Sequence, residues 1–207
     1  MKMEDVVWQA LALAVQRFNE SEDPKTLLCP RQIPPKNKTE RAAASERAIT
    51  YRLAFYLESE LRRAGVVGEH GPIIVDCEYN RHIGAGKELE GAEDEIRQIV
   101  LEARSRELKS DSDGFYVFSV APDIVVHQRQ TDENNLLVIE VKKRSNPETE
   151  EYDALKLELF TKPKDNLKGY GYKFGAWVVA EDKCDADPRC LRIIRQFKNG
   201  VGTECAE

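Results

Sequence analysis

The chain has 207 residues, of which 41% are hydrophobic and 33% are charged, and its formal net charge is −6 at pH 7. This composition is typical of a globular protein, and the length suffices for a single domain, residues 1–207, whose core needs no disulfide or metal for support. No apolar run approaches the ~20 residues of a membrane span, and the acidic start at residues 1–5 is unlike a signal peptide. We therefore expect a cytoplasmic protein without a membrane partner, and the acidic charge argues against a general nucleic-acid coat.

Two helices separated by a proline-rich connector are predicted first. Residues 5–19 place apolar side chains at helical spacing along one face. The connector, residues 22–38, holds four prolines and is locally basic, so it is either a solvated loop or an arm that contacts phosphate. A second helix is predicted from an N-cap at Thr39 to Ala64, with Gly65 as the residue that stops it.

Glu46 lies on the apolar stripe of this second helix. The stripe continues one and two turns further along the chain, at Ile49 and Leu53. A carboxylate on a buried face needs a partner. Glu46 therefore either points into a functional site or sits at the edge of the stripe and pairs with Arg47 or Thr50.

A first strand is predicted over residues 73–81, where apolar and polar side chains alternate. Its polar end carries Glu78, Arg81 and His82, which either look toward a substrate or form the solvent face of an edge strand. Residues 87–109 are rich in charge and have apolar side chains at helical spacing. This segment predicts an amphipathic helix inserted between the first and second core strands.

Residues 120–127 and 136–143 are rich in β-branched side chains and flank a polar turn, so they predict a β-hairpin. Side chains alternate between the two faces of a strand. One face of each arm is wholly apolar, with Ile124 and Val126 on the first arm. The other face of the hairpin gathers four polar side chains: Asp123, His127, Glu140 and Lys142.

Charges in an apolar sheet need an explanation, because a buried charge is stable only when it is paired or bound to a metal. The two converging carboxylates, Asp123 and Glu140, suit a hard divalent cation such as Mg²⁺. Lys142 beside such a cation can hold or help activate a water aimed at a phosphodiester. The alternative is a structural ion pair between Lys142 and either carboxylate.

Pro122-Asp123, followed after a gap by Glu140-Val141-Lys142, resembles the PD-(D/E)XK motif of the restriction-endonuclease-like nuclease superfamily. The resemblance covers about residues 39–180. It implies an α/β fold with a mixed central sheet of at least four strands flanked by helices, in the order helix, strand, hairpin, helix, strand. It also implies an endonuclease or exonuclease that hydrolyses phosphodiester bonds. DNA is the better candidate for its substrate, but the sequence does not separate an enzyme that acts on DNA from one that acts on RNA.

The resemblance further implies roles for individual residues. Asp123 and Glu140 would hold Mg²⁺ or Mn²⁺, Glu46 would complete or orient the metal shell, and Lys142 would orient the attacking water. His127, on the same face as Asp123, either touches substrate or is only a polar residue at the end of a strand.

A further helix is predicted over residues 149–161, after a strand end that Lys143 and Arg144 make suitable for a polyanion. Lys156 follows Asp153 by three residues on one side of that helix, so Lys156 either reaches the site or forms a surface ion pair. The candidate contacts to substrate are five basic side chains: Lys143, Arg144, Lys156, Arg81 and His127.

The last third of the chain adds basic residues and a final core strand. Lysines interleave with Tyr170 and Tyr172, a pattern that suits charge and stacking contacts to nucleic acid. Residues 174–180 predict a core strand, residues 189–198 an arginine-rich helix or strand, and residues 200–207 a frayed tail. The five cysteines have no zinc-site spacing and are expected to be free thiols.

Two functions remain open on sequence alone. The first is a metal-dependent nuclease, which would act as a homodimer if it cuts both strands of a duplex. The second is a non-catalytic protein that keeps the nuclease-like scaffold inside a nucleic-acid-processing or defence assembly. The acidic charge and the lack of a separate DNA-recognition domain favour the second, whereas the intact set of Asp123, Glu140 and Lys142 favours the first.

Overall fold

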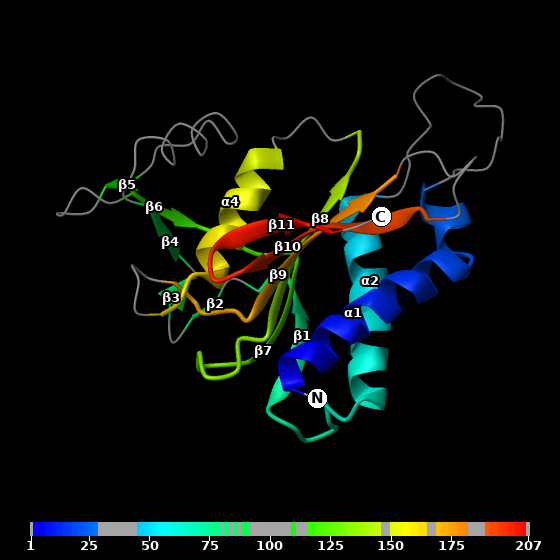
Figure 1. The fold of residues 1–207 in the computed structure, drawn as a ribbon, viewed down its shortest axis with the longest axis horizontal. Helices are drawn as coiled ribbons and strands as arrows, with labels where there is room; N and C mark the ends of the chain where they lie inside the picture. The colour runs from blue at the N-terminus through cyan, green and yellow to red at the C-terminus, as the bar shows by residue number, and fades with distance from the viewer. Residues whose placement is uncertain are drawn as a thin grey trace.

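The computed structural model describes residues 2–28, 45–79, 81–82, 85–86, 88–91, 109–110, 116–145, 150–164, 169–181 and 189–205. Its centre is a six-stranded mixed β-sheet with helices on both faces (Figure 1). The predicted α/β class, with a mixed sheet of at least four strands flanked by helices, is therefore confirmed.

The sheet has the strand order β1-β7-β8-β9-β10-β11. The bounds are β1 (Ile73–Cys77), β7 (Ile124–Gln128), β8 (Leu137–Lys143), β9 (Phe174–Ala180), β10 (Leu191–Lys198) and β11 (Val201–Glu204). Neighbouring strands are antiparallel except β8 and β9, which are parallel. A parallel pair needs a crossover between its strands, and helix α4 (Glu150–Thr161) lies in that connection.

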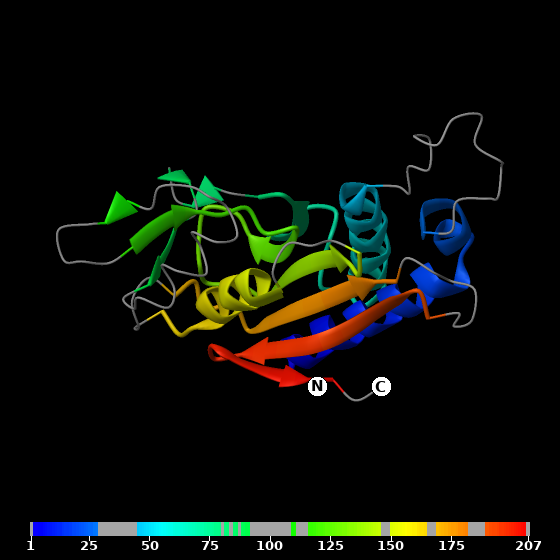
Figure 2. The same cartoon turned by 90° about the horizontal axis from the view of Figure 1, so that it is seen from above.

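Helices cover the sheet on both sides (Figure 2). On one face lie α1 (Met3–Glu20), which the short π-helix η1 (Pro24–Leu28) follows, and α2 (Glu46–Arg63). Helix α4 covers the other face and forms a second apolar cluster with the sheet. The helical spacing of apolar residues in α1 explains its docking, since each of these side chains is buried: Val7, Ala10, Leu11, Ala14, Val15 and Phe18.

The predicted hairpin is present as β7 and β8, with Val125 paired to Val138. Ile124 and Val126 join the cluster under α1 and α2, whereas Val125 and Val138 join the cluster under α4. The alternation predicted from the sequence therefore holds, and the face that carries Asp123 is the one that α4 covers. The element order α2, β1, β7–β8, α4, β9 also matches the predicted order.

Two predicted boundaries are wrong for local reasons. Helix α2 begins at Glu46 because Ser45, its N-cap, has an extended backbone; Thr39 lies outside the described residues. The first hairpin arm begins at Ile124, later than predicted, because Pro122 has no N–H to donate to a ladder. The predicted end of α2 is confirmed, since Gly65 follows the C-cap Ala64 with a positive φ of 72°.

The predicted helical insertion at 87–109 is wrong where the structure describes it. Strands β4 (Glu88–Gly91) and β5 (Lys109–Ser110) flank β6 (Tyr116–Ser119) in a small antiparallel sheet, and residues 92–108 lie outside the described residues. Pairing to β6 gives the backbone of β4 its hydrogen bonds, whereas the residues that carry the helical spacing lie outside the described part of the chain. A second small pair joins β2 (Arg81–His82) to β3 (Ala85–Gly86).

The predicted frayed tail is also wrong. Residues 201–204 form β11, which pairs with β10 at the edge of the main sheet and places Glu204 opposite Arg195. The turn between these strands contains Asn199 and Gly200, both at positive φ. A turn of this kind returns the chain along β10, so backbone pairing orders a segment whose side chains are all exposed.

Candidate active site

Asp123 and Glu140 meet at the end of the β7–β8 hairpin. Ile124 pairs with Ile139, so the antiparallel register sets Asp123 opposite Glu140. The Val141 backbone N–H donates a 2.7 Å hydrogen bond to Asp123 Oδ2. This bond fixes the Asp123 carboxylate against the strand that carries Glu140.

The environment of Asp123 resists its ionisation. Burial raises the pKa of this carboxyl from 3.8 to about 6, although the Val141 hydrogen bond and the nearby ammonium groups of Lys156 and Lys142 act in the opposite direction. Asp123 is therefore mostly ionised at neutral pH, but it gains from any further positive charge that arrives beside it.

Glu140 is buried, with 3% of its surface exposed. Its Oε2 accepts a 2.6 Å hydrogen bond from Lys156 Nζ. Its Oε1 is buried without a hydrogen-bond partner among the residues that the structure describes. Burial raises the pKa of Glu140 well above its usual value, and the Lys156 ammonium opposes that rise. One oxygen of this carboxylate is thus held by a cation, and the other oxygen is an unused acceptor.

Asp153, on α4, holds both lysines of the site. Its Oδ2 lies 3.1 Å from Lys142 Nζ, and its Oδ1 lies 2.8 Å from Lys156 Nζ. Burial raises the pKa of Asp153, but the two ammonium groups outweigh this effect and lower it. Burial likewise disfavours the charged form of Lys156, but the carboxylates of Glu140 and Asp153 raise the pKa of Lys156 above its usual value.

We call these five side chains the charge cluster: Asp123, Glu140, Lys142, Asp153 and Lys156. When all five are ionised, three carboxylates face two ammonium groups, so one negative charge is unbalanced. The sequence placed Asp153 only as a surface partner of Lys156. Its i, i+3 spacing to Lys156 was the available signal, but the sequence does not show that α4 packs this side against the sheet.

The donor set of the charge cluster fits a magnesium-like cation through two carboxylates. Mg²⁺ commonly uses one or two protein carboxylates and keeps several waters, and the unused Oε1 of Glu140 is an acceptor of the required kind. Within the described parts of the chain there is no group of three or more histidine, cysteine, aspartate or glutamate side chains spaced for a metal. Asp123 and Glu140 are therefore the two residues that would hold such a cation.

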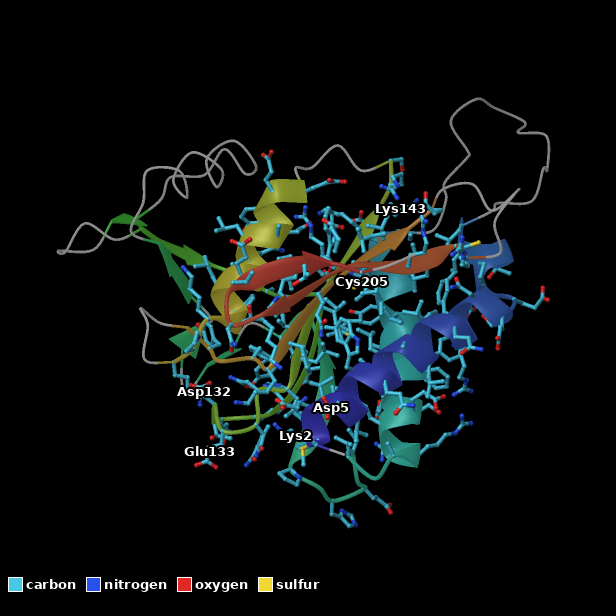
Figure 3. All side chains as sticks on the ribbon, in the orientation of Figure 1. Lys2, Asp5, Asp132, Glu133, Lys143 and Cys205 are labelled. Atoms are coloured by element: carbon cyan, nitrogen blue, oxygen red, sulfur yellow. The ribbon has the colours of Figure 1, made fainter. Side chains whose placement is uncertain are left out.

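Glu46, expected to complete or orient the metal shell, lies beside the end of β8. Its Oε1 accepts a 2.9 Å hydrogen bond from the Lys143 backbone N–H. Figure 3 shows Lys143 at the end of β8 beside the start of α2, and Asp132 and Glu133 far away in the β7–β8 turn. The observed role of Glu46 is to tie α2 to the end of the strand that carries Glu140 and Lys142.

The other candidate contacts to substrate fall in three settings. Arg144 is exposed near the site, where its Nη2 lies 2.8 Å from Glu181 Oε1. His127 is buried, with its Nε2 3.1 Å from Asp76 Oδ2 and its ring packed edge-on against Tyr79. Arg81 lies in β2, and the structure describes only its backbone.

Several basic or aromatic residues that suggested nucleic-acid contact are engaged elsewhere. Tyr170 and Tyr172 are buried against Phe160 in the α4 cluster, so their rings are not open for base stacking. The arginine-rich segment is strand β10, where Arg192 lies 2.5 Å from Glu181 and Arg195 pairs with Glu204. The two arginines of β10 are therefore paired with carboxylates.

Comparisons with protein-family models, with curated proteins and with solved structures found no match for this chain. In the described part of the chain, no helix has both the length and the apolar character needed to cross a membrane. The described cysteines, at 77, 190 and 205, are free thiols as expected, while Cys29 and Cys184 lie outside the described residues.

Proposed function

We propose that this protein is a metal-dependent nuclease that hydrolyses phosphodiester bonds, with DNA as its substrate. The observation that carries the proposal is the charge cluster, in which carboxylates from neighbouring strands and two lysine ammonium groups converge at one end of the sheet. The resemblance to PD-(D/E)XK nucleases supports it, because the element order around the cluster is the one that the resemblance implies.

The chemistry follows from the groups present. A divalent cation bound by Asp123 and Glu140 would polarise the phosphodiester and lower the pKa of a bound water. Lys142, only 12% exposed, would leave Asp153 to donate a hydrogen bond to the attacking water or to a phosphate oxygen. Its ammonium would thereby offset the negative charge that develops on the phosphate in the transition state.

The strand end next to the cluster would receive the substrate backbone. Lys143 and the exposed Arg144 continue the run of basic side chains past Lys142 at the end of β8, and Arg144 would leave Glu181 to contact a phosphate. A local basic surface of this kind suffices for phosphate contact in a protein whose total charge is negative.

The proposal is tested by metal binding and cleavage together. Calorimetry with Mg²⁺ and Mn²⁺ is expected to show binding by the wild type, and weaker binding by Asp123→Ala and Glu140→Ala. Cleavage of plasmid and single-stranded DNA is expected to fall by about 100-fold or more in both variants and in Lys142→Ala. Glu58→Gln, which removes a partly exposed carboxylate paired with Arg62 on α2, is the control and is expected to cleave normally.

A non-catalytic scaffold is the second candidate, and one observation favours it. Both lysines of the charge cluster are already paired with carboxylates in the structure. A self-contained ion-pair network needs neither metal nor substrate. This candidate replaces the first if the wild type binds no metal and Asp123→Ala alters only stability.

A further inference from the structure

Lys156 contacts Glu140, the second carboxylate of the proposed metal site. Its Nζ lies 2.6 Å from Glu140 Oε2 and 2.8 Å from Asp153 Oδ1, and only 4% of the residue is exposed. No other ammonium or guanidinium group in the described part of the chain is paired with Glu140. The buried Glu140 carboxylate thus has its own cation before any metal arrives.

A divalent cation on Oε1 of Glu140 and the Lys156 ammonium on Oε2 would share one carboxylate and would repel each other. Two positive charges a few ångströms apart in a poorly solvated site repel by several times the thermal energy. Binding of the metal is therefore stronger when Lys156 retreats from Glu140.

Asp153 makes that retreat possible at low cost. Asp153 lies three residues before Lys156 on α4, so the two side chains remain neighbours even when Lys156 no longer contacts Glu140 on β8. A buried ammonium that lost Glu140 without another partner would be strongly destabilised. Through Asp153 the ammonium keeps a carboxylate while it moves off Glu140.

We propose that Lys156 is a built-in competitor of the divalent cation at Glu140, and that Asp153 is the positioning residue that receives Lys156 when the cation binds. This inference rests on the metal site of the proposed function. It assigns to α4 control over metal affinity: the ion pair Lys156–Glu140 stabilises the metal-free protein and limits how tightly the cation is held.

The decisive variant is Lys156→Met, which keeps the length of the side chain and removes its charge. We expect it to bind Mg²⁺ at least about tenfold more tightly than the wild type, because the competing charge is gone. Lys142→Met removes the same charge from the cluster but from a lysine that is paired with Asp153 and not with Glu140. Its effect on affinity is expected to be clearly smaller, and Lys198→Met, on an exposed strand end, is expected to have none.

Binding is read by calorimetry and by tryptophan fluorescence, so no cleavage assay enters. Trp177 is the register partner of Glu140 on the neighbouring parallel strand and packs in the α4 cluster. A Trp8→Phe background leaves it as the sole tryptophan reporter. Lys156→Gln serves as a second neutral variant if Lys156→Met does not fold, and Lys156→Arg, which keeps the charge, is expected to retain an affinity close to wild type.

A double-mutant cycle tests the role of Asp153. Asp153→Asn alone is expected to weaken Mg²⁺ binding, because Glu140 is then the one carboxylate among the described residues that is paired with Lys156. In the Lys156→Met background the same change is expected to have a much smaller effect. Equal effects in both backgrounds would show that Asp153 acts only by its charge and would overturn its assignment.

Unchanged or weaker Mg²⁺ binding in Lys156→Met and Lys156→Gln overturns the competition itself, and so does the absence of binding in every variant. These results can be told apart from a failure of the proposed nuclease function. Tighter binding in Lys156→Met with no DNA cleavage by any variant would uphold the inference and contradict the nuclease. Normal cleavage by the wild type with unchanged metal affinity in Lys156→Met would do the reverse.

Discussion

Asp123 shows how one residue can be held in a charge state that its surroundings disfavour. Its folded-state pKa of about 6 lies above the 3.8 of an unburied carboxyl, mainly because of burial. The folded protein therefore holds the Asp123 proton more tightly than the unfolded chain does. Its contribution to stability is fully present below pH 3.8 and is lost as the pH rises through about 6.

Asp123→Asn is accordingly expected to stabilise the metal-free protein above pH 6 by about 1–3 kcal/mol, because the amide carries no charge and can still accept the Val141 N–H. The difference in unfolding free energy between variant and wild type is expected to shrink as the pH falls toward 3.8. Urea denaturation across this pH range measures it. Asp5→Asn, at an exposed position of α1, is the control. A variant that is less stable at neutral pH would contradict the assigned burial.

Also at the residue scale, the sequence predicted the residues of the candidate site but not the ion pairs that they form. Asp123, Glu140 and Lys142 were identified because charges interrupted two apolar strands. Their actual ion pairs, Lys142 with Asp153 and Lys156 with Glu140, were not foreseen. Which carboxylate an ammonium meets depends on the depth at which α4 packs, and no local spacing encodes that depth.

At the scale of elements, α4 is the part that assembles the charge cluster. It brings Asp153 and Lys156 against β8, and it is seated on β9 at Gly175. A Cβ atom at Gly175 would lie 3.0 Å from Phe197 Cβ, 3.2 Å from Thr161 Cγ2 and 3.3 Å from Leu157 Cδ2. The absence of a side chain at this position lets α4 pack closely on β9, beside Phe197 of the neighbouring strand β10.

Gly175→Ala is therefore expected to destabilise the protein by about 1–3 kcal/mol, because the added methyl group pushes α4 away from β9. Metal affinity is expected to change with it, since α4 carries Lys156. Gly68→Ala is the matched control: a Cβ there meets nothing closer than 3.5 Å, and the substitution is expected to be nearly neutral. Chemical denaturation of both variants measures the difference, and equal stabilities would refute tight seating at Gly175.

At the scale of the whole molecule, one sheet separates two apolar clusters. The larger cluster joins the sheet to α1 and α2, and the other joins it to α4. The same strands β7, β8 and β9 contribute alternate residues to both clusters, so unfolding of these strands disrupts both clusters at once. We therefore expect the chain to unfold as one cooperative unit, in keeping with the single domain expected from its length.

The two tryptophans test this directly, because Trp8 packs against the larger cluster and Trp177 lies within the other. Trp8→Phe leaves the reporter on the α4 side, and Trp177→Phe leaves it on the α1 side. Within each single-tryptophan variant, the fluorescence and far-ultraviolet circular dichroism transitions in urea are expected to coincide. Separate transitions in either variant would show that the two faces unfold independently.

The sequence by itself determined the α/β class, the β7–β8 hairpin with its two faces, the helices α1 and α4, and the final core strand β9. These features follow from periodicity and propensity, which act over a few neighbouring residues. Tertiary structure alone decided the small sheet at β4, β5 and β6, the pairing of β11, and the burial of Tyr170 and Tyr172. It also decided that Lys156 pairs with Glu140 and that Glu46 accepts a hydrogen bond from the backbone at the end of β8. Each of these depends on contacts between segments far apart in the chain, whose free energies outweigh the local preferences that the sequence displays.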